Sequence, residues 1–330
     1  MSWSRLSFLL LLPLAACTDR DGQSAGSGAK DAADAADADA DTDTDTDADT
    51  DTDADTDTDT ATDPPPGWVQ VSVGTRHGCG VANGDEAWCW GSDDAGEASP
   101  PAEVAFLGVT VGEQHTCGIT TDFQAVCWGL DTYGQARPTD HSFQRVSAGW
   151  AHSCGVTTEG AVRCWGLDIH GQSSPPEGLS FTRVSAGIYH TCGITTDARA
   201  VCWGLDTLGQ SSPPEDERFV AVTTGSLHSC GVTEAGAAVC WGQGGNGQTT
   251  PVEGHAYAAV DAGAYHTCGL GTGGEALCFG WGDEGQLTPP EGLVFATLSA
   301  GGATSCGVTT DRQAHCWGRD ELGQARPPAL

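Results

Sequence analysis

The chain shows three zones when apolar and polar positions are followed from its first residue. Residues 6–14 form a short apolar run, whereas residues 31–63 alternate Asp with Ala or Thr and carry no apolar side chain larger than Ala. From residue 67 onward, short apolar segments alternate with turns rich in Gly, Pro, Asp and Thr, a pattern typical of β-strands rather than of amphipathic helices. The three zones predict an export signal, an extended linker and an all-β domain.

The all-β zone contains seven repeats, which the cysteines mark. A first series of cysteines recurs every 37 or 38 residues, and a second series follows each member by ten residues. The resulting pairs are Cys79 with Cys89, Cys117 with Cys127, Cys154 with Cys164, Cys192 with Cys202, Cys230 with Cys240, Cys268 with Cys278, and Cys306 with Cys316. Because a unit of this length cannot bury its apolar side alone, we expect the seven units to stack on one another in a closed circle.

The repeat consensus is similar to that of a known family. V-S-A-G-x-x-H-T-C-G-(V/I) followed by C-W-G-x-D-x-x-G-Q resembles the repeat of the regulator of chromosome condensation family over about residues 68–328. The resemblance implies a propeller, commonly of seven blades, and the short units resemble the compact bacterial form. Each unit has room for about three strands, so the sequence predicts a seven-bladed β-propeller with three-stranded blades over residues 67–330. The nucleotide-exchange activity of the eukaryotic namesake is not carried over, because its features outside the bare repeat cannot be located here.

Strand geometry brings the two cysteines of each repeat together. Side chains alternate between the two faces of a strand, so His152, Cys154 and Val156 share one face. A symmetric hairpin then sets Cys164 opposite Cys154, at a separation that a disulfide can close. Export favours oxidation. The sequence therefore predicts seven disulfides within the blades, with free buried thiols as the alternative.

The first 66 residues predict export and anchoring. Leu14, Ala15, Ala16 and Cys17 resemble the lipobox of bacterial lipoprotein signals, which implies cleavage after residue 16 and a lipid on the Cys17 thiol. An ordinary secretory signal cut nearby is the alternative. Thr18 is not the Asp associated with inner-membrane retention, so we expect an outer-membrane lipoprotein that faces the periplasm or the cell exterior. Residues 17–66 should stay an extended, disordered linker, because calcium capture by the Asp ladder would need a Gly turn and a Glu that it lacks.

Charge excludes a nucleic-acid role. Residues 31–63 hold 15 Asp and no basic residue, and from Pro64 onward there are 28 acidic residues, 10 Arg and no Lys. A surface that binds phosphates needs clustered basic side chains. We therefore expect no nucleic-acid partner, and contact with the membrane only through the lipid anchor.

Three polar or aromatic positions recur with the repeat and are interpreted as structural. A Trp, replaced once by Phe279, is expected to pack between blades; an Asp in the C-W-G-x-D turn is expected to bind its own backbone; and a His before the first cysteine is expected to form hydrogen bonds. Seven-fold spacing spreads these histidines, so no metal site and no cofactor are predicted. The Trp positions are Trp90, Trp128, Trp165, Trp203, Trp241 and Trp317, the Asp positions are Asp131, Asp168, Asp206 and Asp320, and the His positions are His77, His115, His152, His190, His228 and His266, with Thr304 in the seventh repeat.

Binding is expected where the repeats differ, in the two residues between the consensus Gly and His. Trp150, Tyr189 and Tyr265 are large aromatics at these variable positions, and Trp and Tyr are favoured as interface anchors; simple packing against neighbours is the alternative.

No catalytic constellation stands apart from the repeat, and the acids at 215–217 look like a solvated loop. We expect a monomeric, membrane-anchored binding module for an unknown protein or glycan, not an enzyme. An inhibitor of an extracellular or periplasmic enzyme and a polysaccharide-acting enzyme remain alternatives.

Overall fold

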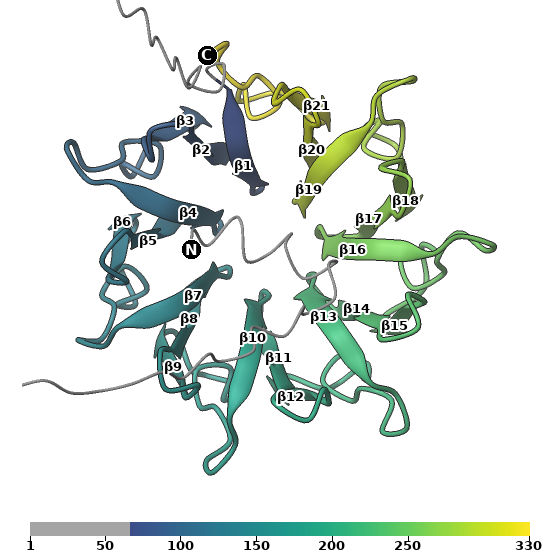
Figure 1. The fold of residues 1–330 in the computed structure, drawn as a ribbon. Helices are drawn as coiled ribbons and strands as arrows, with labels where there is room; N and C mark the ends of the chain where they lie inside the picture. Colours follow the sequence, from purple (N-terminus) through teal and green to yellow (C-terminus); the bar gives the residue numbers. More distant parts are fainter. Residues whose placement is uncertain (1–66) are drawn as a thin grey trace, which may run out of the picture. The chain divides into compact units, whose positions relative to one another are not determined.

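The computed structural model describes residues 67–330, which form seven three-stranded antiparallel sheets arranged around a centre (Figure 1). Each sheet is one repeat, so the prediction of seven three-stranded blades is confirmed. Cys17, the signal and the linker predicted from the sequence lie outside the described residues. No helix that could span a membrane occurs between residues 67 and 330.

Each blade runs from an inner strand beside the centre, through a middle strand, to an outer strand (Figure 1). The inner strands are β1 (Trp68–Val73), β4 (Phe106–Val111), β7 (Phe143–Ala148), β10 (Phe181–Ala186), β13 (Phe219–Thr224), β16 (Tyr257–Ala262) and β19 (Phe295–Gly301). The middle strands are β2 (His77–Ala82), β5 (His115–Thr120), β8 (His152–Thr157), β11 (His190–Thr195), β14 (His228–Thr233), β17 (His266–Gly271) and β20 (Thr304–Thr309). The outer strands are β3 (Ala87–Gly91), β6 (Ala125–Gly129), β9 (Val162–Gly166), β12 (Ala200–Gly204), β15 (Ala238–Gly242), β18 (Ala276–Gly280) and β21 (Ala314–Gly318).

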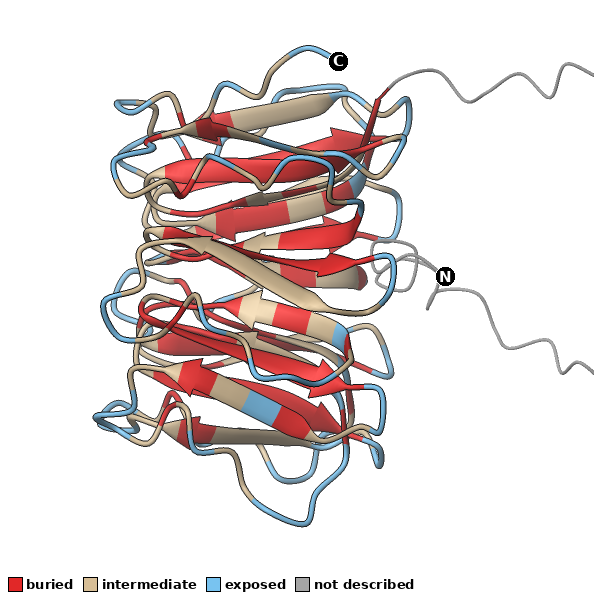
Figure 2. Cartoon of the chain, turned by 90° about the vertical axis from the view of Figure 1, so that its left-hand side faces the viewer, coloured by how far each residue is buried: buried red, intermediate tan, exposed pale blue. Residues whose placement is uncertain are grey.

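The core lies between adjacent blades. All residues of the middle strands are buried, while exposed residues concentrate in the connections (Figure 2). Between blades two and three, for example, Phe143 and Trp165 pack against Ile119 of the preceding blade, which confirms that the recurring Trp packs between blades. The glycine of the H-x-C-G motif makes this packing possible, because a Cβ on Gly155 would lie only 2.5 Å from Cδ1 of Phe143.

Seven disulfides join the middle and outer strands. Cys154 lies directly opposite Cys164 in the register of β8 and β9, and the two Cα atoms are 4.0 Å apart. The other six pairs follow the same pattern, with a sequence separation of ten between partners. These are the pairs that the cysteine spacing predicts. Each bond closes a hairpin and limits the conformations of the unfolded chain.

Hydrogen bonds between inner strands connect the blades around the centre. In each step, a side-chain oxygen of one inner strand accepts a backbone N–H at the end of the next or one residue before it: Ser147 Oγ accepts from Ala186, 3.0 Å away. Seven such bonds occur, and the seventh, from Val73 N–H to Ser299 Oγ at 3.1 Å, joins the first blade to the last. The Ser of the V-S-A-G motif is thus a connector between neighbours.

The junction of blades one and seven contains no shared strand. Residues Trp68–Val73 pair with β2 of their own blade, so this strand is not shared with the terminal blade. Besides Ser299, the junction is held by the backbone N–H of Trp68, which donates to the Arg312 carbonyl at 2.9 Å. The Trp90 indole also donates, to the Gln324 carbonyl at 2.8 Å. Blades one and seven therefore associate by packing and hydrogen bonds between separate sheets.

Candidate binding face

One end of the propeller gathers the variable positions between the consensus Gly and His of each repeat. We call this end the first-loop face: it consists of the loops between inner and middle strands (residues 74–76, 112–114, 149–151, 187–189, 225–227, 263–265 and 302–303) and the turns that follow the outer strands. The two sets share one end because His152 pairs with Gly166 in the sheet and Leu167 N–H donates to the Ala151 carbonyl at 2.9 Å. The variable loops thus come together, as the sequence predicts.

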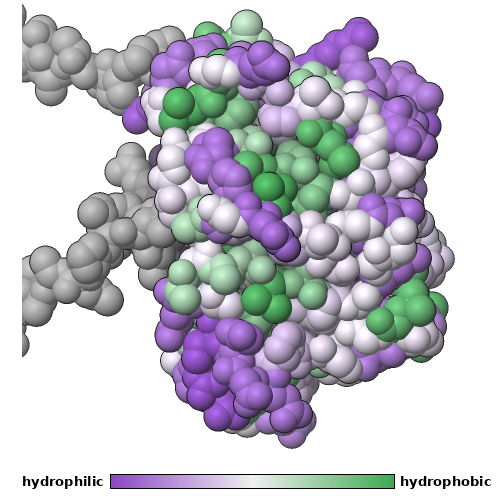
Figure 3. Space-filling model, turned by 90° about the vertical axis from the view of Figure 1, so that its right-hand side faces the viewer, coloured by the Kyte–Doolittle hydropathy of each residue, from purple (hydrophilic) through white to green (hydrophobic). Residues whose placement is uncertain are grey.

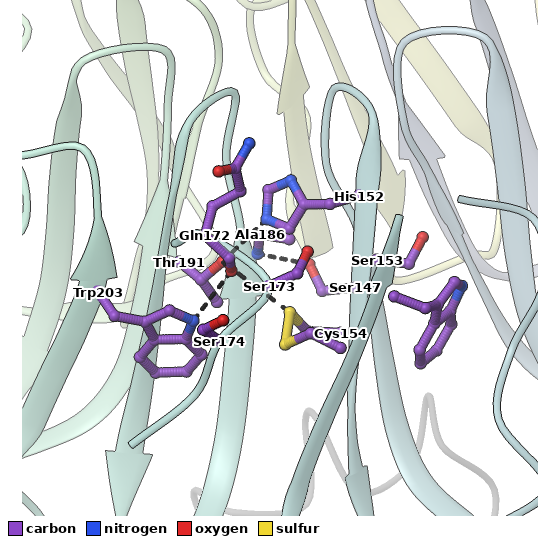
Figure 4. The surroundings of a disulfide bond; sticks show 12 residues. Ser147, His152, Ser153, Cys154, Gln172, Ser173, Ser174, Ala186, Thr191 and Trp203 are labelled. Carbon is purple, nitrogen blue, oxygen red and sulfur yellow. Dashed lines mark hydrogen bonds between the residues drawn. A yellow bond between two sulfur atoms is a disulfide. The ribbon is translucent and has the colours of Figure 1, made fainter. Parts of the chain in front are cut away.

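Buried histidines lie at the start of the middle strands, directly after the variable loops of this face. His152 Nε2 lies 2.8 Å from the Thr191 hydroxyl of the next blade, which donates to the Gln172 carbonyl at 2.9 Å (Figure 4). Trp203 also donates to this carbonyl, at 2.9 Å. Because the hydroxyl gives its only proton to the carbonyl, it accepts one from the imidazole, so Nε2 carries the hydrogen. Five further histidines repeat this contact with a Ser or Thr of the following blade.

All six histidines are held neutral by their surroundings. Burial lowers their pKa from 6.5 to about 3 or 4, because the charged form loses its hydration. Within residues 67–330, their Nδ1 atoms have no hydrogen-bond partner and no cluster of His, Cys, Asp or Glu could hold a metal ion. The structural role predicted for these residues is confirmed by the contacts that they make.

The histidine contact is missing at one junction, where both of its members are replaced. Blade seven has Thr304 in place of His, and its hydroxyl donates to the Arg319 carbonyl of its own blade at 2.8 Å. Blade one has Gly78 at the position of the accepting Ser or Thr, and a Cβ there would lie 2.6 Å from atoms of the Trp90 ring. The first and last blades therefore meet without this contact, and two other bonds join them: the Arg312 guanidinium donates to the Asn83 side-chain oxygen, and Gln324 Nε2 donates to the Thr75 carbonyl at 3.3 Å.

The recurring Asp residues stabilise the turns of the first-loop face. Asp168 Oδ1 accepts the backbone N–H of Ser173 at 2.7 Å, and its Oδ2 accepts the Ser174 hydroxyl at 2.7 Å. Asp131, Asp206 and Asp320 accept the equivalent backbone N–H. The prediction that these carboxylates bind their own turns is confirmed, and the carboxylates are used structurally rather than paired for acid–base chemistry.

Two of the three predicted anchors meet on this face. The rings of Trp150 and Tyr189 lie edge to face with centroids 5.5 Å apart, and the His170 ring also lies edge to face with Tyr189, with centroids 5.4 Å apart. Trp150 and Tyr189 are half-buried, and His170 is exposed. Nearby, the channel between the inner strands opens into a cavity of about 150 Å³ whose wall includes Trp150. The aromatic cluster is thus preassembled and partly accessible.

Tyr265 lies apart from that cluster. It is 41% exposed and lines a second cavity of about 450 Å³ together with Trp281, Asn246 and Arg319. Trp281 is not among the anchors predicted from the sequence, although it is a Trp outside the repeat position, and that irregularity is the signal that could have found it. The first-loop face therefore carries two separate aromatic sites.

Other surfaces are less suited to recognition. The acids at 215–217 are exposed in a connection, as expected for a solvated loop. On the side of blades five to seven, hydrophobic residues form small, separate patches between more hydrophilic residues (Figure 3). Such scattered patches are ordinary on a protein surface. The accessible aromatic clusters on the first-loop face are the stronger candidates.

A family model for the regulator of chromosome condensation (RCC1) repeat matches six segments that together cover more than half of the chain. They are residues 107–135, 143–172, 181–210, 219–248, 257–286 and 295–324. The chain belongs to the RCC1 repeat family. The first RCC1-like unit lies outside the matched segments, and it carries Gly78 and Glu97 where the other repeats have Ser or Thr and Gln.

Solved structures of two receptor-kinase ectodomains resemble the chain. The ectodomain of the receptor kinase CR4 from Physcomitrella patens is 26% identical with a TM-score of 0.68, and the match covers 77% of this chain and 74% of that one. The CRINKLY WD40 ectodomain of the receptor kinase ACR4 from Arabidopsis thaliana is also 26% identical, with a TM-score of 0.65 and coverage of 79% and 100%.

Prp20p from Saccharomyces cerevisiae, whose structure was described with its binding to Gsp1p and histones, is 15% identical with a TM-score of 0.62, covering 71% of this chain and 80% of that one. This likeness shows the fold alone. A comparison with curated proteins finds no match. The RCC1 repeat assignment establishes the architecture, and the function must be argued from the first-loop face.

Proposed function

We propose that this protein is a lipid-anchored binding module that presents the first-loop face of its propeller to a protein partner in the periplasm or at the cell surface. The observation that carries the proposal is the contact between Trp150 and Tyr189, supported by His170. Equivalent loops hold small or polar residues such as Thr75 and Ser226, so the repeat does not require aromatics here. Half-buried Trp and Tyr in a preformed cluster are the residues that most often dominate protein interfaces.

The framework supports a rigid platform. Seven disulfides join strands within the blades, and seven inner-strand hydrogen bonds join each blade to the next, so the loops lose little conformational entropy when a partner binds. Prp20p, which shares the fold, also binds proteins, namely Gsp1p and histones. Location outside the cytoplasm is supported by the disulfides and by the two ectodomain relatives.

Anchoring rests on the lipobox ending at Cys17. In cells grown with an alkyne-tagged fatty acid, the full-length chain should become labelled and partition into detergent, because the thioether-linked lipid supplies the apolar chains. Cys17→Ser should abolish both the label and the partitioning. Labelling that survives this substitution would disprove lipidation at Cys17 without touching the proposal about the binding face.

The binding face is tested by capture of partners with the full-length chain from envelope extracts. Trp150→Ala combined with Tyr189→Ala should remove specific partners, while the melting temperature changes by no more than a few degrees because neither ring is fully buried. The matched control is Leu179→Ser combined with Val294→Ser, which removes two exposed apolar side chains (42% and 49% exposed) from the opposite end. The proposal fails if the Leu179→Ser and Val294→Ser variant loses its partners while the Trp150→Ala and Tyr189→Ala variant keeps them, because the interface would then lie at the opposite end.

A further inference from the structure

The second cavity of the first-loop face is formed by the residues at two variable positions in neighbouring blades. Blade seven places Ala303 where blades four and six have Tyr189 and Tyr265, which leaves space beside the Tyr265 ring. Blade six places Trp281 where blades three and four have Leu167 and Leu205. The outcome is a cavity of about 450 Å³ with one small wall and two aromatic walls.

The backbone holds the aromatic walls in place. Trp281 N–H donates to the Tyr265 carbonyl at 2.9 Å, so the two residues are tied to each other within blade six. On the far side, Ala264 N–H donates to the Gly302 carbonyl of blade seven, also at 2.9 Å. The backbone that carries the walls is therefore fixed by hydrogen bonds, and the cavity does not depend on a flexible loop to form. Its volume falls within the range of about 300 to 1,000 Å³ that small-molecule sites occupy.

The walls offer polar groups that the rest of the described chain does not use. Within residues 67–330, the Tyr265 hydroxyl, the Trp281 indole N–H and the Asn246 carboxamide form no side-chain hydrogen bond with protein. Together they provide both donors and acceptors around apolar ring surfaces. A purely apolar occupant would cover these groups without replacing their bonds to water, which costs free energy.

Charge narrows the chemistry of the occupant. Arg319 lines the cavity, but its guanidinium is paired with the carboxylate of Glu321, and Glu284 lies close enough to act on it as well. Two carboxylates, those of Glu321 and Glu284, therefore act on the single guanidinium of this wall. An anionic ligand is disfavoured at such a wall, whereas a neutral one is not.

We propose that the cavity bounded by Tyr265, Trp281, Asn246 and Ala303 binds a neutral pyranose ring of a glycan. Such a ring has an apolar C–H face that packs against an aromatic side chain and hydroxyls that exchange hydrogen bonds with the amide, indole and phenol groups. This site is separate from the Trp150 and Tyr189 cluster. The glycan proposal can therefore be disproved while the proposed protein-binding function holds, and the protein-binding function can be disproved while the glycan proposal holds.

The test is isothermal titration of the full-length chain with four neutral trisaccharides: maltotriose, cellotriose, mannotriose and triacetylchitotriose. At least one should bind saturably with one site per chain, and trigalacturonate should bind at least tenfold more weakly. Ala303→Tyr should fill the cavity and abolish binding, and blades four and six show that the repeat accepts Tyr at this position. Trp281→Leu, which restores the residue of other blades, should weaken binding at least tenfold.

The matched control is Trp88→Leu, which removes a Trp that is 43% exposed on an outer strand and should leave binding unchanged. The proposal is overturned if none of the four trisaccharides binds, or if binding survives both cavity variants. It is equally overturned if Ala303→Tyr removes a captured protein while no saccharide binds, because the cavity would then belong to the protein interface.

Discussion

The six buried histidines make the propeller sensitive to mild acid. Lowering the pH from 7.5 to 5.5 leaves them neutral in the folded protein, since burial holds their pKa at about 3 or 4. Unfolding restores an ordinary pKa, so the unfolded chain takes up protons that the folded chain does not. Stability is therefore complete only well above pH 6.5, and it declines as the pH falls through 6.5 toward 4.

The size of the effect follows from the pKa difference. At pH 5.5, one unit below the unfolded value, each histidine favours unfolding by about 1.4 kcal/mol, and six together by about 8 kcal/mol. That is comparable with the whole stability of many domains, roughly 5 to 15 kcal/mol. Asp261 acts in the opposite direction, because burial raises its pKa and protonation of the folded state then adds stability on acidification, but it is one group against six.

Denaturant titrations with the disulfides intact, repeated between pH 7.5 and 5.5, measure this dependence. Near pH 5.5 the slope should correspond to an uptake of about five to six protons on unfolding. His152→Thr imitates blade seven and should lower the uptake by about one proton, whereas His141→Asn, at an exposed position, serves as the control. Stability that stays flat over this range, or an uptake that His152→Thr leaves unchanged, would refute the reasoning.

Three further predictions concern the framework. Replacing Cys154 and Cys164 together by Ser should cost about 2 to 3 kcal/mol, measured by denaturant titration at pH 7.5. Gly155→Ala should cost about 1 to 3 kcal/mol because the added methyl group would overlap the Phe143 ring, 2.5 Å away; the melting temperature of this variant should fall well below that of wild type. Ser299→Ala leaves a backbone N–H of blade one without its acceptor, which should cost about 1 to 3 kcal/mol and raise hydrogen exchange at that amide.

Controls for these variants exist within the repeat. Gly245→Ala adds a methyl group in open space and should change stability by less than about 0.5 kcal/mol. Ser147→Ala removes the same bond as Ser299→Ala at an internal junction, where the His152 contact persists. Equal exchange at both junctions would show that the missing histidine contact between blades seven and one has no effect on local opening.

The architecture could be predicted because it repeats. One cysteine pair per unit marks both the strand register and the number of blades, and the Trp and Asp positions are placed correctly because each has to satisfy the same neighbours in every blade. The sequence predicts that the recurring His forms a hydrogen bond, but it does not identify the partner residue. The accepting hydroxyl belongs to the next repeat rather than to the same strand.

The binding sites could be predicted less completely. The variable positions identify Trp150, Tyr189 and Tyr265, but only the structure shows that Trp150 and Tyr189 touch while Tyr265 stands elsewhere. The Tyr265 cavity depends on Ala303 and Trp281, which come from different repeat positions in adjacent blades. The cavity needs a small side chain, Ala303, in one blade and a large one, Trp281, at a different repeat position in the neighbouring blade. Such a combination leaves no periodic signal in the sequence.

The central claim is that partners engage the first-loop face. Hydroxyl-radical footprinting of the full-length chain, alone and with its captured partner, tests this directly. The account predicts that oxidation of Trp150 and Tyr189 is suppressed in the complex, while Leu179 and Val294 at the opposite end remain as reactive as in the free protein. Protection of Leu179 and Val294 with unchanged oxidation of the aromatic pair would contradict it.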